Sequence, residues 1–183
     1  MPRTSVHIEP QGALAVARHY LRDLVYGAND GIITTFAVVA GVAGGSLSDV
    51  AVLIVGAANL AADGVAMGVG NLLAIRAHES ALEADGRPEE ETYPWKHGFA
   101  TLVAFVMSGA VPLLPYLLPG TGAARLRWSA LLTMASLFGV GVARAVVTRD
   151  RWWRTGFEML LLGGLVAAAA YGAGALVAAL AAP

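Results

Sequence analysis

The chain has 183 residues, of which 57% are hydrophobic, 22 are glycines and only 14% are charged. A soluble domain of this size would lack the polar side chains needed to cover its surface, so the composition predicts a membrane protein. A net charge of −1 argues against nucleic-acid binding, and the absence of cysteine excludes disulfides, thiolate metal sites and a cysteine nucleophile.

The first predicted element, within residues 1–24, is an amphipathic helix at the inner membrane interface. Leu14 and Leu21 are interleaved there with Arg18 and Arg22, which gives the helix one apolar and one charged side. The charges also interrupt any apolar core of the kind that a cleavable signal peptide needs. We therefore expect this segment to stay attached and to lead into the first membrane span.

Five apolar stretches follow, each long enough to cross roughly 30 Å of membrane hydrocarbon as a helix of about 20 residues. They cover about residues 25–46, 50–75, 98–119, 126–148 and 157–181. The predicted fold class is an all-α membrane protein, with a bundle of five transmembrane helices in residues 25–181. The polar segment 76–97 is expected to be a short loop, and Ser48 or Asp49 is the expected N-cap of the second helix.

The distribution of basic residues predicts the orientation of this bundle. With the N-terminus inside, the inner segments hold nine arginine or lysine residues and the outer segments hold two. This positive-inside bias places the C-terminus outside after five spans. Eleven arginines against one lysine, with abundant alanine and glycine, are typical of GC-rich bacterial genomes, so the expected location is a bacterial plasma (inner) membrane.

Two aspartates, Asp30 and Asp63, fall inside the first and second spans, at membrane depth. A charged side chain there costs about 2.5–3.5 kcal/mol on insertion scales, which is more than one interhelical hydrogen bond usually returns. Intramembrane carboxylates usually face the bundle interior and bind ions or carry protons. We therefore interpret both aspartates as functional.

The second span places Asp63 in a polar stripe. Asn59, Asp63, Met67 and Asn71 recur every four residues, so amide, carboxylate and thioether groups share one helix face. Taken singly, Asn59 and Asn71 are explained by hydrogen bonds between helices, and Met67 by core packing. Taken together, the oxygens suit Fe²⁺ and Mn²⁺, and a thioether adds a contact that Mg²⁺ and Ca²⁺ do not use.

Two further inferences concern protons and auxiliary ligands. A buried acid that releases a metal can take up a proton, and this competition is the basis of antiport. Glu79, beside His78, is a candidate auxiliary metal ligand, although a solvated acidic loop explains it as well. The remaining histidines show no metal-ligand spacing. No permanently bound cofactor is expected, only the transported Fe²⁺ or Mn²⁺.

These motifs carry a resemblance to a known family. The run from Asp30 to Gly45 and the run from Gly56 to Gly70 resemble the paired first and second helices of the vacuolar iron transporter family. The segments Pro112–Tyr116 and Trp153–Gly164 are similar to its third and fifth helices. The resemblance implies a dimeric five-helix Fe²⁺/Mn²⁺ transporter, driven by proton exchange, with its ion path between the two copies.

The resemblance also implies residue roles and exposes two departures. Asp30 aligns with the mid-membrane aspartate of the family, and Met67 with its pathway methionine. Well-studied members insert a cytosolic helical metal-binding domain between the second and third helices, where this chain has only residues 76–97. Asn71 stands where the family commonly has an acid, which weakens either metal capture or proton exchange.

A symmetric homodimer is expected from glycine-rich helix faces, at Gly41 and Gly45 on the first helix and at Gly56 and Gly70 on the second. Two rival functions stay open. An intramembrane aspartyl protease would also use two acids, but the Gly-x-Gly-Asp and Tyr-Asp motifs of such enzymes are not in the sequence. A membrane adaptor would recruit an iron-storage partner through the loop. The favoured prediction is a transporter, not an enzyme.

Overall fold

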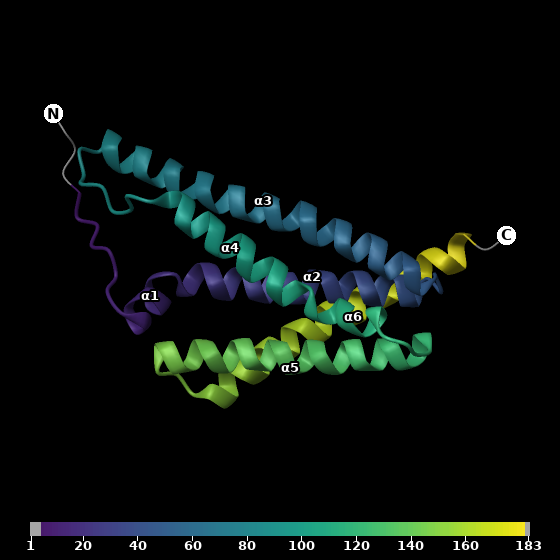
Figure 1. The fold of residues 1–183 in the computed structure, drawn as a ribbon. Helices are drawn as coiled ribbons and strands as arrows, with labels where there is room; N and C mark the ends of the chain where they lie inside the picture. The colour runs from purple at the N-terminus through teal and green to yellow at the C-terminus, as the bar shows by residue number, and fades with distance from the viewer. Residues whose placement is uncertain (1–4, 182–183) are drawn as a thin grey trace.

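The computed structural model describes residues 5–181 and is almost entirely helical (Figure 1). In chain order the elements are α1 (Ala13–His19), α2 (Leu21–Gly44), α3 (Asp49–Ala84), α4 (Pro94–Gly109), the 3-10 helix η1 (Val111–Leu117), α5 (Gly122–Thr148) and α6 (Trp152–Ala181). Within residues 5–181 the only β-type pairing is an isolated bridge between Ser5 and Glu89.

Five segments are long and apolar enough to cross a membrane, in agreement with the predicted fold class. They are Leu21–Gly44, Asp49–Ala84, Pro94–Leu117, Gly122–Thr148 and Trp152–Ala181. At 36 residues, α3 is about 54 Å long, which exceeds the roughly 30 Å of hydrocarbon. Its last turns therefore extend beyond the membrane and carry the first part of what the sequence suggested was a loop.

The N-terminal segment contains less helix than the amphipathic pattern suggested. Among residues 5–20, helix is confined to α1, and Tyr20 separates it from α2. Ahead of α1 the chain is extended and lies against the α3–α4 loop, where the N–H of Val6 donates to the carbonyl of Glu89 (2.9 Å). Residues 1–4 of the predicted interfacial segment lie outside the described residues.

The N-cap of α3, at the end of the bundle opposite the α3–α4 loop, is one of the two predicted residues. The side chain of Ser48 accepts a hydrogen bond from the N–H of Ala51 (3.3 Å) and caps α3. Asp49 follows and pairs with Arg125 of α5 at 2.6 Å. This pairing joins the starts of two spans at the end of the bundle that the basic residues predict to be outside.

The central element is α2, which packs against α3, α4, α5 and α6 (Figure 1). Its buried side chains Phe36 and Val39 form a core with Val52 and Leu60 of α3 and Phe105 of α4. A second, smaller core joins α2 to α5 and α6. The face of α2 that bears Asp30 is therefore held in place from several sides.

Glycines set the close spacing of α2 and its neighbours within one chain. A Cβ at Gly31 would lie 2.3 Å from the carbonyl oxygen of Phe105 in α4, and one at Gly174 of α6 would lie 2.1 Å from that of Gly41. The expectation that Gly41, Gly45 and Gly56 pack against a second copy is wrong. The first two lie against α6, and Gly56 lies against Leu113 of η1.

We expect Gly174→Ala to destabilise the bundle, because the new methyl group has no room against the backbone of Gly41. Overpacking of this kind typically costs about 1–3 kcal/mol. Gly172→Ala, two residues earlier in α6, is the matched control, because nothing lies within 4 Å of its added Cβ. Thermal unfolding in detergent should show a lower melting temperature for the first variant and an equal or higher one for the second. Equal melting temperatures would contradict the close α2–α6 packing.

Candidate functional site

Three neighbouring stripes run along α3, and they differ in what covers them. Positions 52, 56, 60, 64 and 68 are buried in the bundle. The predicted polar stripe, Asn59, Asp63, Met67 and Asn71, is half-buried throughout. The next stripe, Ala58, Ala62, Ala66, Gly70 and Ala74, is exposed. The polar residues thus lie along the boundary between the packed face and the open face of α3.

Asp30 of α2 is also half-buried, and its carboxylate is close enough to Asp63 for the two charges to interact. The structure therefore brings together the two acids that the sequence singled out. One turn further along α2, the hydroxyl of Thr34 donates to the backbone carbonyl of Asp30 (2.8 Å). Asn59 supplies an amide nitrogen on the same stripe as Asp63, buried and without a hydrogen-bond partner in the described structure.

Met67 has a mixed environment. It packs against the core cluster around Phe36 and Phe105, yet it stays half-buried on the polar stripe, one turn from Asp63. The packing accounts for the methionine without any ion. On α3 it lies between Asn71 and Asp63, one helical turn from each.

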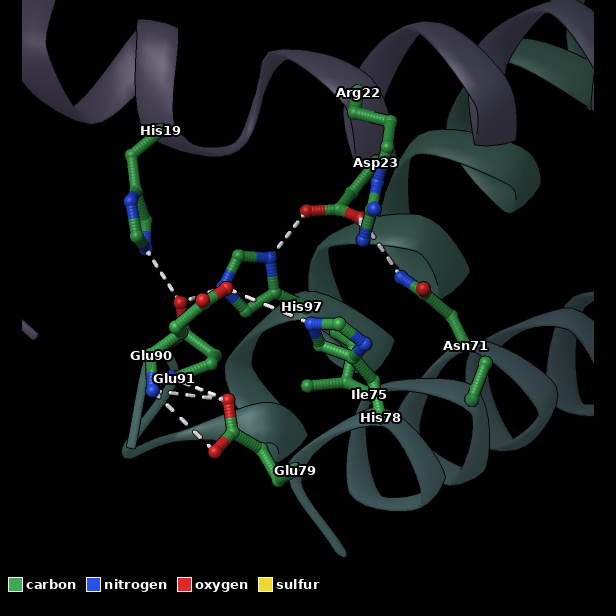
Figure 2. Close-up of a pocket in the computed structure, with 11 residues that line it drawn as sticks. His19, Arg22, Asp23, Asn71, Ile75, His78, Glu79, Glu90, Glu91 and His97 are labelled. Carbon is green, nitrogen blue, oxygen red and sulfur yellow. Dashed lines mark hydrogen bonds and ion pairs between the residues drawn. The ribbon is translucent and has the colours of Figure 1, made fainter. Parts of the chain in front are cut away.

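An open pocket of about 670 Å³ lies between α2, α3 and α4, at the end of the bundle that the basic residues predict to be inside (Figure 2). Most of its lining residues carry polar or charged side chains: His19, Arg22, Asp23, Asn71, His78, Glu79, Glu90, Glu91 and His97. Because α2 and α3 run antiparallel, the pocket lies below the Asp30–Asp63 pair on both helices.

Asp23 is the most buried acid of the pocket, with 2% of its surface exposed. One carboxylate oxygen accepts from the Asn71 amide at 2.8 Å, and the other lies 2.5 Å from Nδ1 of His97. The same amide also reaches the hydroxyl of Thr101 in α4 (2.8 Å). This network ties α2, α3 and α4 together and satisfies a charge that would otherwise be costly to bury.

Glu79 is engaged with the backbone of the α3–α4 loop. Its carboxylate accepts hydrogen bonds from the N–H groups of Glu90 (3.2 Å) and Glu91 (2.8 Å), as Figure 2 shows. His78, one position before Glu79 on α3, pairs with Glu90 at 3.5 Å. The acid that the sequence nominated as an auxiliary metal ligand therefore holds a loop in place.

Comparison with known proteins decides the family. The model of the VIT family matches residues 21–93 and 78–175, which together cover most of the chain. The chain belongs to the VIT family. Vacuolar iron transporter 1 of Arabidopsis thaliana is 24% identical over 234 residues, which cover 92% of this chain and 94% of that protein. Vacuolar iron transporter homolog 1 of Oryza sativa subsp. japonica is 31% identical over 175 residues, which cover 88% of this chain and 75% of that protein.

The predicted resemblance is thus confirmed, and so is the short length of this VIT-family chain. The Arabidopsis alignment has more positions than this chain has residues, so that relative contains residues with no counterpart here. The two matched segments overlap at residues 78–93, the end of α3 and the loop after it.

Sequence reasoning missed the inner pocket of this VIT-family protein. The sequence pattern did not single out Asp23, although Asp23 lies two helical turns before Asp30 on the same side of α2. His97 gave no signal, because its partners Asp23 and Glu91 belong to other segments of the chain. The spacing of Asp23 and Asp30 was the available local clue.

Proposed function

We propose that this chain transports a divalent first-row transition metal, Fe²⁺ or Mn²⁺, out of the cytosol in exchange for protons. The observation that carries the proposal is the interacting pair of half-buried acids, Asp30 and Asp63, inside two neighbouring spans. Relatives named as iron transporters support iron as the cargo. The direct test is metal flux into liposomes that contain the purified chain as their only protein.

The helix geometry supports a path from the inner pocket to the acids. Asp23 and Asp30 are seven residues apart on α2, about 10 Å along the axis. Asn71 and Asp63 are eight residues apart on α3, about 12 Å. The Asn71 amide donates to Asp23, so these two residues lie at the same level of the antiparallel helices α2 and α3. Moving a similar distance outward from that level reaches Asp30 on α2 and Asp63 on α3.

The groups along this path suit the proposed cargo. Carboxylate and amide oxygens are ligands for Fe²⁺ and Mn²⁺, and the thioether of Met67 adds a softer contact that favours these ions over Mg²⁺ and Ca²⁺. The same carboxylates can hold a proton once the ion has left, because a low-dielectric surrounding favours the neutral acid. Metal and proton would then occupy the pair alternately.

The direction of transport rests on the orientation of the bundle. The positive-inside bias favours an inner pocket that opens to the cytosol, with the C-terminus outside. We propose a bacterial plasma membrane as the location from the composition alone, while the relatives are named for vacuoles. In either compartment the proposed ion movement is away from the cytosol.

We also propose that two copies assemble through α3. Its exposed stripe Ala58, Ala62, Ala66, Gly70 and Ala74 has a small residue at every fourth position, which permits close contact between helices in a membrane. The polar stripe lies directly beside it. A two-fold partner on the small stripe would cover Asp63 and Met67 and would bring a second set of the same groups to the path.

The two rival functions are an intramembrane protease and a membrane adaptor. Membership of a family of transporters removes the intramembrane aspartyl protease, so the paired acids are assigned to ion movement and not to peptide hydrolysis. An adaptor that recruits an iron-storage partner would use the α3–α4 loop and would need no acids at membrane depth. Flux by the purified chain alone separates transporter from adaptor.

Proton coupling gives a prediction of its own. The solution that faces the inner pocket is kept neutral, and the solution on the opposite side of the liposome membrane is made acidic. Metal transport toward the acidic side should then accelerate, because protons from that side displace the metal from Asp30 and Asp63. This transport should also carry protons in the reverse direction. A pH-sensitive dye and a metal-sensitive dye in the same vesicles measure both movements.

Vesicles treated with a protonophore are the control, since an imposed gradient then collapses and the acceleration should disappear. Metal flux that ignores the gradient and moves no protons would make the two acids simple ligands of a uniporter.

A further inference from the structure

A second group of ligand-type side chains lies at the edge of the inner pocket, which His19 and Glu91 also line. His7 comes from the extended N-terminal segment, His19 is the last residue of α1, and Glu91 belongs to the α3–α4 loop. One ligand atom from each of these three residues lies within 4.8 Å of the other two. Three segments that are distant in sequence thus converge on one point.

The contacts inside this group approach the spacing of a metal site. Nδ1 of His7 is 3.4 Å from one oxygen of Glu91, and Nε2 of His19 is 3.5 Å from the other. Two ligands that each lie about 2.1 Å from a tetrahedral ion are about 3.4 Å apart. A small inward movement of the two rings is enough to place an ion between them.

Two histidine nitrogens that face Glu91 lack a hydrogen bond. Nε2 of His19 and Nε2 of His97 are buried and have no hydrogen-bond partner among the described residues. They lie 3.5 Å and 3.1 Å from the same oxygen of Glu91. Buried polar atoms normally have hydrogen-bond partners, so these nitrogens and the Glu91 carboxylate suit a shared cation.

The side chains are shielded from solvent and held in position. The exposed fraction of the side chain is 6% for His7, 15% for Glu91 and 23% for His19. Asp23 binds the other nitrogen of His97, and Glu79 fixes the backbone at Glu91, as Figure 2 shows. Such outer contacts orient the ligands in metal sites.

The N-terminal segment is tied down as well, which keeps His7 at this place. Glu9 pairs with Lys96 at 2.5 Å, and the Lys96 ammonium lies over the ring of Tyr93.

We infer that His7, His19 and Glu91, with His97 beside them, bind one divalent first-row transition metal at the inner mouth of the chain. Two imidazoles and a carboxylate suit Fe²⁺, Co²⁺ or Zn²⁺ and do not suit Mg²⁺ or Ca²⁺, which take oxygen ligands. The site is separate from the Asp30–Asp63 pair. Its role, which rests on the proposed function, is to capture metal and pass it to the inner pocket through His97 and Asp23.

Co²⁺ binding to the full chain in detergent tests the site, because histidine ligands give a tetrahedral or five-coordinate Co²⁺ distinct visible absorption. The measurement uses the Asp30→Asn, Asp63→Asn double variant, so that the membrane pair does not compete. We expect one Co²⁺ per chain and at least tenfold weaker binding after His7→Ala with His19→Ala, or after Glu91→Gln. Glu158→Gln is the matched control for Glu91→Gln and should leave the affinity unchanged, because Glu158 pairs with Arg144 of α5, outside the group and the pocket.

X-ray absorption of the bound Co²⁺ needs no further variant and covers the case in which the histidine variants fail to fold. Scattering from two or three imidazoles is expected. Coordination by oxygen alone, or Co²⁺ affinity that survives His7→Ala with His19→Ala, would overturn the site. If Co²⁺ binds as expected while the wild-type chain shows no flux, the site stands and the proposed function fails. If the flux is present and Co²⁺ does not bind, only the site fails.

Discussion

Replacing either membrane aspartate by asparagine, Asp30→Asn or Asp63→Asn, is expected to lower metal flux by at least about tenfold without unfolding the protein. Asparagine keeps the size and a hydrogen-bonding oxygen but removes the charge that holds the cation. Loss of an interaction with a charged group typically costs about 1.5–3 kcal/mol, and 1.4 kcal/mol is already a factor of ten. Flux into liposomes, with thermal unfolding in detergent as the folding check, measures the effect.

The paired arrangement makes a sharper prediction for the double variant. We propose that Asp30 and Asp63 hold one ion together, so combining the substitutions should lower the flux little beyond either one alone. Asp49→Asn is the matched control, since Asp49 pairs with Arg125 at the far end of α3 and not with the path. Normal flux in a folded Asp30→Asn or Asp63→Asn chain would remove that residue from the mechanism.

The membrane acids could be predicted from the sequence because an apolar background makes a charge conspicuous. The spans follow from charge-free stretches of sufficient length, and the four-residue period of Asn59, Asp63, Met67 and Asn71 follows from helix geometry alone. Both are local properties of the chain. Their structural counterparts, the five spanning segments and the half-buried stripe, agree with the pattern.

The inner pocket could not be predicted in this way, because its residues come from segments far apart in the sequence. His97 contacts Asp23, 74 positions earlier, and no spacing rule connects them. Glu79 shows that a local pattern can also suggest a role that the fold does not favour. An acid next to a histidine suggested a ligand, but the folded loop offers it backbone N–H groups, and these take up its oxygens.

The glycines show why a motif predicts close packing but not the partner. A small residue every fourth position permits two helices to approach, whether they belong to one chain or to two. Gly41 and Gly45 meet α6 of their own chain, whereas Gly70 has nothing within 4 Å of an added Cβ. Which face stays open depends on how the five spans are arranged, and it becomes visible only in the folded bundle.

The open face of α3 leads to the second prediction, that Ala62→Leu with Ala66→Leu separates the two copies and stops transport. Both positions are exposed in the single chain, so leucine there faces lipid in a monomer and leaves the bundle folded. In a dimer the larger side chains keep the α3 helices from the close approach that the small stripe permits. The two copies of Asp63 and Met67, which adjoin the stripe, would then no longer share one path.

Cross-linking in native membranes measures the dimer, and liposome flux measures its consequence. Ala168→Leu with Gly172→Leu is the matched control, because these positions are also exposed and also four residues apart, but they lie on α6. We expect the α3 variant to be monomeric and inactive and the α6 variant to match the wild type. A wild-type chain that cross-links only as a monomer while it transports metal would place a complete ion path inside one copy. The half-buried acids would then have to be shielded from lipid by α2 and α3 alone.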